Sequence, residues 1–132
     1  MTSRFTELTI DCRDPEMLAA FWCAVLDFEV IDRSEGKVEI GSWAPTAEEV
    51  RARQMPPTLH FIKVPESKSG KNRLHLDVSP IDGSTEDEVC RLLDLGATKA
   101  DVGQGPARSW VVMADPDGNE FDVVRTLAPQ RN

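Results

Sequence analysis

Leu74-His-Leu-Asp-Val78 alternates apolar and polar side chains, and it repeats the pattern of Leu8-Thr-Ile-Asp-Cys12 nearer the start of the chain. Since residues two apart in a strand share a face, each stretch predicts a half-buried strand. A helix start follows both strands. Asp14-Pro-Glu16 offers an N-cap, a proline at the first helical position and an acid, and Ser84-Thr-Glu-Asp-Glu88 is also a helix-capping sequence. This recurrence predicts an internal duplication.

Three further strands are expected after each of these helices. The second helix ends at Gly96, and its apolar face is formed by Val89, Leu92 and Leu93. Thr46-Ala-Glu-Glu49 predicts a short extra helix in the first half, and Asp115-Pro-Asp-Gly118 predicts a turn between the last two strands. The expected strands span 28–33, 37–41, 58–64, 97–101, 109–114 and 119–125. The chain therefore reads as an α+β fold of two βαβββ modules, about residues 5–66 and 72–126, in one domain of residues 1–132.

Composition excludes several classes of function. The 132 residues carry 15 basic and 23 acidic side chains, a formal net charge of −8 that disfavours nucleic acid and anionic membranes as partners. No apolar run is long enough to cross a membrane, and the N-terminus lacks the pattern of a secretion signal, so we expect a cytoplasmic protein. Cys12, Cys23 and Cys90 lack metal-site spacing and are expected to be reduced and mostly buried.

Strand alternation sorts the polar side chains onto one face. Leu8, Ile10 and Cys12 belong to the core side of their strand, which leaves Glu7 and Asp11 on the opposite side. The same reasoning places further acids and both histidines of the chain on the face away from the core: His60, His75, Asp77, Glu120 and Asp122. If that face is concave, crowded carboxylates need protons, basic groups or a cation to offset them.

Several of these residues have a second, purely structural interpretation. A strand histidine is more often a hydrogen-bonded structural group than a ligand. Trp22 is expected in the core, whereas Trp43 and Trp110 suit either packing or stacking on a flat ligand. The basic side chains of the connector, Lys68, Lys71 and Arg73, are either solvated or pair with the acids or with an anionic substrate. The sequence assigns no role to the segment from Thr46 to Met55.

The order of elements and several motifs resemble the vicinal oxygen chelate superfamily, which includes glyoxalase I, extradiol dioxygenases and the bleomycin- and fosfomycin-resistance proteins. The motifs that resemble its glyoxalase-like subgroup are Val64-Pro-Glu66, Lys68, Lys71-Asn-Arg-Leu-His-Leu-Asp77, Leu95-Gly-Ala97 and Asp115-Pro-Asp-Gly-Asn-Glu-Phe121. The resemblance covers about residues 5–126. It implies two modules whose sheets curl into a cupped barrel, with helices outside and a ligand cavity inside.

The resemblance also implies a site. Metallated members carry ligands near the start of the first and fifth strands and three residues after the asparagine of the turn motif, which correspond here to Glu7, His75 and Asp122; His60 is the fourth candidate. Such a set suits one Ni, Zn, Mn or Fe ion. No nucleotide cofactor is expected, because Gly103-Gln-Gly105 lacks the third glycine of a dinucleotide-binding motif and Gly70-Lys71 lacks the frame of a P-loop. Asp122 and Glu7 are then the catalytic candidates, and Asp11, Asp77, Glu120, Arg73 and Trp110 are the candidates for substrate binding.

Two functions follow from the resemblance. The first is a glyoxalase-like enzyme of the lyase, isomerase or oxygenase type that acts on a small molecule. The second is a metal-free protein of the bleomycin-resistance type, which binds and sequesters a small molecule. A homodimer is implied in both cases.

Overall fold

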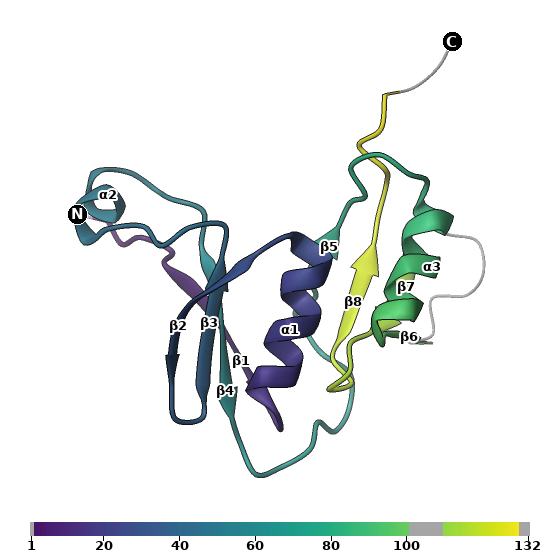
Figure 1. Cartoon of the computed structure of the whole chain (residues 1–132), viewed down its shortest axis with the longest axis horizontal. Coiled ribbons are helices and arrows are strands. Elements are labelled where there is room, and N and C mark those ends of the chain that lie inside the picture. Colours follow the sequence, from purple (N-terminus) through teal and green to yellow (C-terminus); the bar gives the residue numbers. More distant parts are fainter. Residues whose placement is uncertain (1, 101–109, 130–132) are drawn as a thin grey trace. The chain divides into compact units, whose positions relative to one another are not determined.

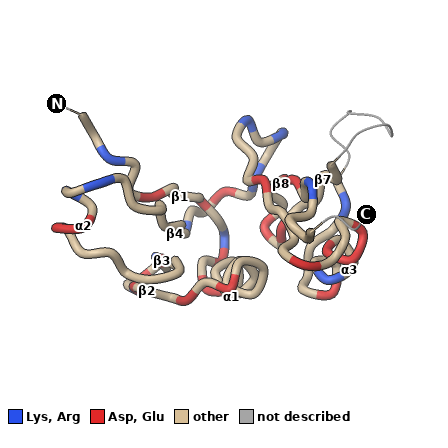
Figure 2. Tube along the Cα trace, turned by 90° about the horizontal axis from the view of Figure 1, so that it is seen from above, with Lys and Arg blue, Asp and Glu red and all other residues tan. Residues whose placement is uncertain are grey.

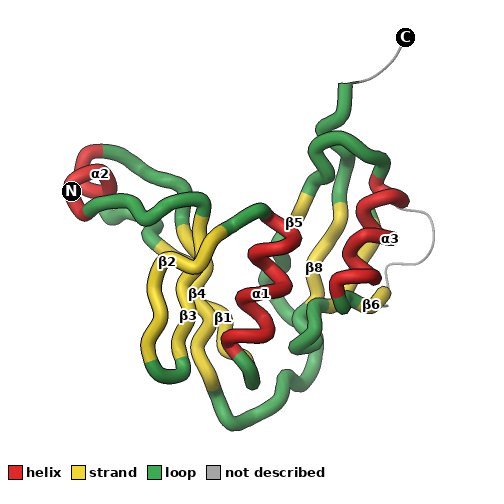
Figure 3. Tube along the Cα trace, in the orientation of Figure 1, coloured by secondary structure: helices red, strands yellow, loops and turns green. Residues whose placement is uncertain are grey.

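The structure is a computed structural model that describes residues 2–100 and 110–129. It divides into two compact units, Met1–Ser67 and Lys68–Asn132. Each unit contains one four-stranded mixed sheet with a helix packed on it (Figures 1 and 3).

Unit 1 has the order strand, helix, strand, strand, short helix, strand. Its sheet has the order β1-β4-β3-β2, in which β1 pairs in parallel with β4 and the other pairs are antiparallel. The elements are β1 (Glu7–Cys12), α1 (Pro15–Leu26), β2 (Glu29–Ser34), β3 (Lys37–Gly41), α2 (Ala47–Ala52) and β4 (Thr58–Lys63).

Helix α1 begins where the sequence predicts. Asp14 is the N-cap and its side chain accepts a hydrogen bond from the Met17 N–H, which satisfies one of the free amide groups of the first turn. The helix buries one face against β3 and β4. The core of unit 1 is formed by Leu18, Phe21, Trp22, Val38, Ile40, Leu59 and Phe61. Trp22 is only 1% exposed, so its predicted place in the core is confirmed.

Unit 2 repeats this arrangement with shorter strands. Its sheet has the order β5-β8-β7-β6, again with the first pair parallel and the others antiparallel. The elements are β5 (Asp77–Val78), α3 (Thr85–Leu95), β6 (Thr98–Lys99), β7 (Val111–Ala114) and β8 (Glu120–Val123). Ser84 and Asp87 form the capping box of α3, and Gly96 ends the helix at a φ of 117°.

The turn before β8 is built by a buried carboxylate. Asp115 is 4% exposed, and its Oδ1 accepts hydrogen bonds from the backbone amides of Asp117 and Asn119, each at 3.0 Å. Gly118 adopts a φ of 91°, which favours glycine. The predicted structural role of this turn is confirmed, and the turn fixes where β8 begins.

Three sequence predictions were wrong in detail. The strand expected from Leu74 starts only at Asp77, and the Leu74 side chain is 80% exposed instead of packed in the core. Leu93, predicted on the buried face of α3, is 40% exposed. Cys12 is buried as expected, but Cys23 is half-buried and Cys90 is exposed. The ends of the strands expected at 97–101 and 109–114 fall partly on residues 101 and 109, which lie outside the described residues.

The α+β class with two βαβββ repeats is confirmed by the two sheets. They are separate four-stranded sheets, and the strands described here do not close into one hydrogen-bonded barrel. None of the described helices has the length and apolar character needed to cross a membrane.

Candidate functional site

Unit 1 pairs two of the residues predicted from the sequence. Nδ1 of His60 lies 3.1 Å from Oε2 of Glu7. The pairing follows from the parallel register of β1 and β4, in which Thr9 lies opposite His60. Glu7 lies two residues before Thr9, so its side chain is on the same face of the sheet. The side chain of His60 is 22% exposed and that of Glu7 is 41% exposed, so the pair is accessible to solvent.

Unit 2 pairs the other two residues. Nδ1 of His75 lies 3.5 Å from Oδ2 of Asp122. Asp122 lies opposite Asp77 in the β5–β8 register, and it is among the few buried charged residues of the described chain. An imidazole and two carboxyl groups therefore lie at one edge of this sheet.

The environment of Asp122 favours its protonated form. Burial raises the pKa of the Asp122 carboxyl, and the hydrogen bond to Asp77 and the charge of Asp77 raise it further, while His75 acts in the opposite direction. Two neighbouring carboxyl groups do not ionise independently, so the pair holds one proton more readily than an isolated aspartate does. A carboxyl group whose pKa is raised in this way holds a proton more readily than a free aspartate does, which suits it to accept and return a proton.

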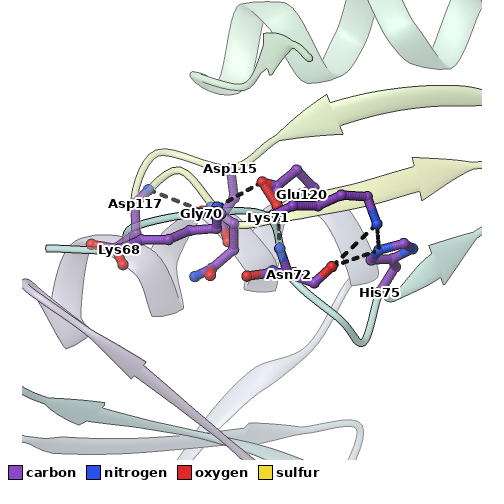
Figure 4. A network of polar contacts seen from close by, with 9 residues as sticks. Lys68, Gly70, Lys71, Asn72, His75, Asp115, Asp117 and Glu120 are labelled. Atoms are coloured by element: carbon purple, nitrogen blue, oxygen red, sulfur yellow. Dashed lines mark hydrogen bonds and ion pairs between the residues drawn. The ribbon is translucent and has the colours of Figure 1, made fainter. Parts of the chain in front are cut away.

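His75 is held from its other side by the backbone of the connector. Its Nε2 lies 3.0 Å from the carbonyl oxygen of Asn72 (Figure 4). A carbonyl only accepts hydrogen bonds, so this contact is a hydrogen bond when Nε2 carries the hydrogen. The other ring nitrogen, Nδ1, faces Asp122. Lys71 Nζ lies 3.1 Å from Nε2 and donates to the same carbonyl at 3.3 Å, which places a positive charge beside the ring.

Glu120 fixes the peptide that holds His75. Its two carboxylate oxygens accept hydrogen bonds from the Asn72 N–H and from Lys68 Nζ, both at 2.7 Å, and Lys68 also donates to the carbonyl of Gly70. The Glu120 side chain is 10% exposed. Burial raises the pKa of this carboxyl, but the hydrogen bonds from Asn72 and Lys68 and the charge of Lys68 outweigh burial, so the net pKa is lowered. Glu120 is therefore an ionised anchor for the connector.

The backbone of Asn72 links these groups, and sequence reasoning did not single it out. Its N–H donates to Glu120, and its carbonyl oxygen lies 3.0 Å from Nε2 of His75. A backbone group leaves no signature in residue type, so only the polar character of the connector hinted at this role. Among the basic residues of the connector, Lys68 pairs with Glu120, which agrees with the expectation that these residues pair with the acids.

The remaining candidates for substrate binding lie nearer the surface. Asp11 and Arg73 are exposed, and Trp110 is 37% exposed just before β7. Trp43, for which packing and stacking on a ligand were both considered, is 43% exposed. Acidic positions are spread over both units, as the red segments of Figure 2 show.

The imidazole and carboxylate groups of these residues suit a transition metal, and they occur as one pair in each unit. Imidazole nitrogen and carboxylate oxygen are suitable ligands for Mn, Fe, Ni and Zn. In the parts of the chain that the structure describes, no three His, Cys, Asp or Glu side chains gather as a metal-binding group. Each unit instead supplies one imidazole–carboxylate pair, Glu7 with His60 and His75 with Asp122.

Comparison with known proteins identifies the family. The model of the glyoxalase-like domain matches residues 7–124. None of the curated proteins matches the chain.

Solved structures share the fold at low sequence identity. A glyoxalase/bleomycin resistance protein/dioxygenase family enzyme from Burkholderia phytofirmans PsJN superposes with a TM-score of 0.65 at 18% identity, over 92% of this chain and 97% of that one. A mutant of the fosfomycin resistance protein FosX from Listeria monocytogenes was solved in complex with Mn(II) and dihydroxypropylphosphonic acid. It superposes with a TM-score of 0.63 at 14% identity, over 98% of this chain and 93% of that one. A glyoxalase-related enzyme from Fulvimarina pelagi superposes with a TM-score of 0.57 at 16% identity, over 93% of this chain and 86% of that one. With the family match spanning nearly all of both βαβββ units, the chain belongs to the glyoxalase-like domain family of the vicinal oxygen chelate superfamily.

Proposed function

We propose that the protein is a small-molecule enzyme of the lyase, isomerase or oxygenase type that uses one divalent metal ion, with Glu7, His60, His75 and Asp122 as the ligands. One observation carries the proposal: the four residues occur as two imidazole–carboxylate pairs, with nitrogen–oxygen distances of 3.1 Å and 3.5 Å. The FosX relative that was solved with Mn(II) supports a metal of this class.

The chain's own residues supply orientation and proton transfer. Asn72 holds Nε2 of His75, which leaves Nδ1 directed toward Asp122. Asp122 and Glu7 are the proposed acid–base groups, and Asp77 beside Asp122 helps to keep a proton available. A bound divalent metal would supply Lewis-acid polarisation of a substrate carbonyl or enediolate oxygen.

The metal content of untagged protein, purified without chelators, tests this proposal. We expect about one bound ion per chain and a rise in melting temperature on adding Mn(II), Fe(II), Ni(II) or Zn(II), because a ligand of the folded state stabilises it by mass action. His75→Ala and His60→Ala should each lose the ion and the rise. Glu35→Gln, an exposed acid in the turn between β2 and β3, is the matched control and should retain both. Metal-free wild-type protein with no thermal response would refute the proposal.

A second candidate is a metal-free protein that binds and sequesters a small molecule. It is favoured by the finding that no three donors gather among the described residues. The net charge of −8 suits a cationic guest. Absence of metal, together with a specific thermal shift from an organic cation, would support this alternative.

A further inference from the structure

The short helix α2 has no role in the hydrophobic core. None of its six residues is buried, and a helix of this length is not stable by itself in water. Its predicted capping box is present, formed by Thr46 and Glu49. Some other contact must therefore hold the helix in place.

Residues near the N-terminus provide that contact. Arg4 donates to the carbonyls of Val50 and Arg51 at 2.9 Å and 3.0 Å. Gln54 donates to the Phe5 carbonyl at 2.7 Å and accepts from the Phe5 N–H at 2.9 Å. We call residues 4–5 and 46–54 the α2 clasp; Figure 1 shows the purple segment that leads into β1 close to α2.

The α2 clasp borders a cavity of about 220 Å³ within unit 1. Its lining is half apolar and half polar: Ile31, Ala44, Pro45 and Val50 on the one hand, and Thr6, Glu7, Glu39 and Thr58 on the other. Thus a helix that buries nothing places Val50 at the wall of a cavity that also contains Glu7, a residue of the proposed site.

The polar groups of the cavity retain free acceptor capacity. Thr58, which is 4% exposed, donates to Oε2 of Glu39 at 2.6 Å, and Oε2 of Glu7 pairs with His60. For the second oxygen of each carboxylate, the described part of unit 1 shows no hydrogen bond or ion pair. Both oxygens are available to a hydrogen-bond donor.

The size of the cavity limits what it can hold. Pockets for drug-sized ligands usually measure about 300–1,000 Å³, so this cavity suits one end of a molecule. A second hollow of about 690 Å³ shares Thr6, Pro45 and Val50 with it and has room for the rest.

We propose that this cavity binds the ammonium-bearing end of a small organic molecule, with Glu39 as the residue that selects the positive charge. Glu7 and Glu39 accept hydrogen bonds from the ammonium group, and the adjoining carbon atoms pack on Ile31 and Val50. The net charge of −8 favours the approach of such a cation. The claim that this molecule is the substrate rests on the proposed function, whereas binding in the cavity does not.

An NMR titration of the full chain tests the proposal with n-butylammonium as the probe, and butyrate and n-butanol as comparators of similar size. We expect n-butylammonium to shift the amide signals of Thr6, Glu39 and Val50, and the comparators to bind at least tenfold more weakly. Glu39→Gln keeps an acceptor for Thr58 but loses the charge, so the Kd for n-butylammonium should rise about tenfold.

Two further variants complete the test. Val50→Trp fills the cavity from α2 and should abolish the shifts, and Glu35→Gln should bind like the wild type. Equal binding of butyrate or n-butanol, or an unchanged Kd in Glu39→Gln, would overturn the proposal. The outcome is separable from that of the proposed function, because a metal-free protein that still binds n-butylammonium through Glu39 refutes only the enzyme, and a metalloprotein that ignores the probe refutes only the cavity.

Discussion

Replacing Glu120 tests the link between β8, the connector and His75. Glu120→Ala removes two charge-assisted hydrogen bonds, from Lys68 Nζ and from the Asn72 N–H, at a site where the Glu120 side chain is 10% exposed. Hydrogen bonds to charged groups contribute about 1.5–3 kcal/mol each. The Lys68 side chain is 18% exposed, and its flexible stem lets the ammonium group return to water. We therefore take the lower end of this range for both hydrogen bonds and expect Glu120→Ala to lower the free energy of unfolding by about 3 kcal/mol.

Three measurements report the effect of Glu120→Ala. Urea unfolding should give the change in free energy, and hydrogen exchange should show faster exchange of the Asn72 amide. Nitrogen-15 NMR should show a change in the tautomer populations of His75, because the Asn72 carbonyl beside Nε2 is no longer fixed. Glu120→Gln keeps an acceptor for the Asn72 amide, so it should preserve the tautomer and lose only about 1–2 kcal/mol.

An exposed ion pair is the control for this experiment. Glu16 pairs with Arg33 at 2.9 Å, but both side chains are 58% exposed, so Glu16→Gln should change the free energy of unfolding far less than Glu120→Ala does. If Glu120→Ala unfolds like the control and leaves both the Asn72 exchange rate and the His75 tautomer unchanged, the proposed chain of contacts is refuted.

Two other perturbations have defined outcomes. The folded-state pKa of Asp122 is raised, so the stability contributed by its carboxyl is fully present below the unfolded pKa and is lost as the pH rises through the folded value. Asp122→Asn, which cannot ionise, should therefore melt higher than the wild type at pH 7, with the difference shrinking toward pH 3; a lower melting temperature at pH 7 would contradict this reasoning. Asp14→Ala removes the N-cap of α1 and should cost about 1 kcal/mol in urea unfolding, whereas the same measurement on Asp32→Ala, an exposed acid in β2, should show almost no change.

Local chemistry in the sequence determined where most elements begin and end. The caps at Asp14, Ser84 and Gly96 act through their nearest neighbours, so residue type alone was sufficient to predict them. Alternation was equally informative in β4, where Leu59 and Phe61 are buried and His60 is not. These signals made the two βαβββ repeats predictable.

Alternation was less reliable in the stretch before β5. Leu74 fits a strand by pattern but is 80% exposed, because only Asp77 and Val78 pair with β8. His75 consequently owes its orientation to the Asn72 carbonyl, a contact that strand parity cannot predict.

The sequence by itself determined the fold class and most helix boundaries, and its resemblance to a known family suggested the four residues proposed as ligands. Only the tertiary structure decided that Glu7 pairs with His60, that Glu120 uses both oxygens to anchor the connector, and that α2 borders a cavity. The physical reason is the separation of the interacting residues along the chain. Caps and periodicity arise from residues within a turn or two of one another, whereas these hydrogen bonds and ion pairs join residues about 50 positions apart. Their partners are set by strand register and backbone position, which residue type does not reveal.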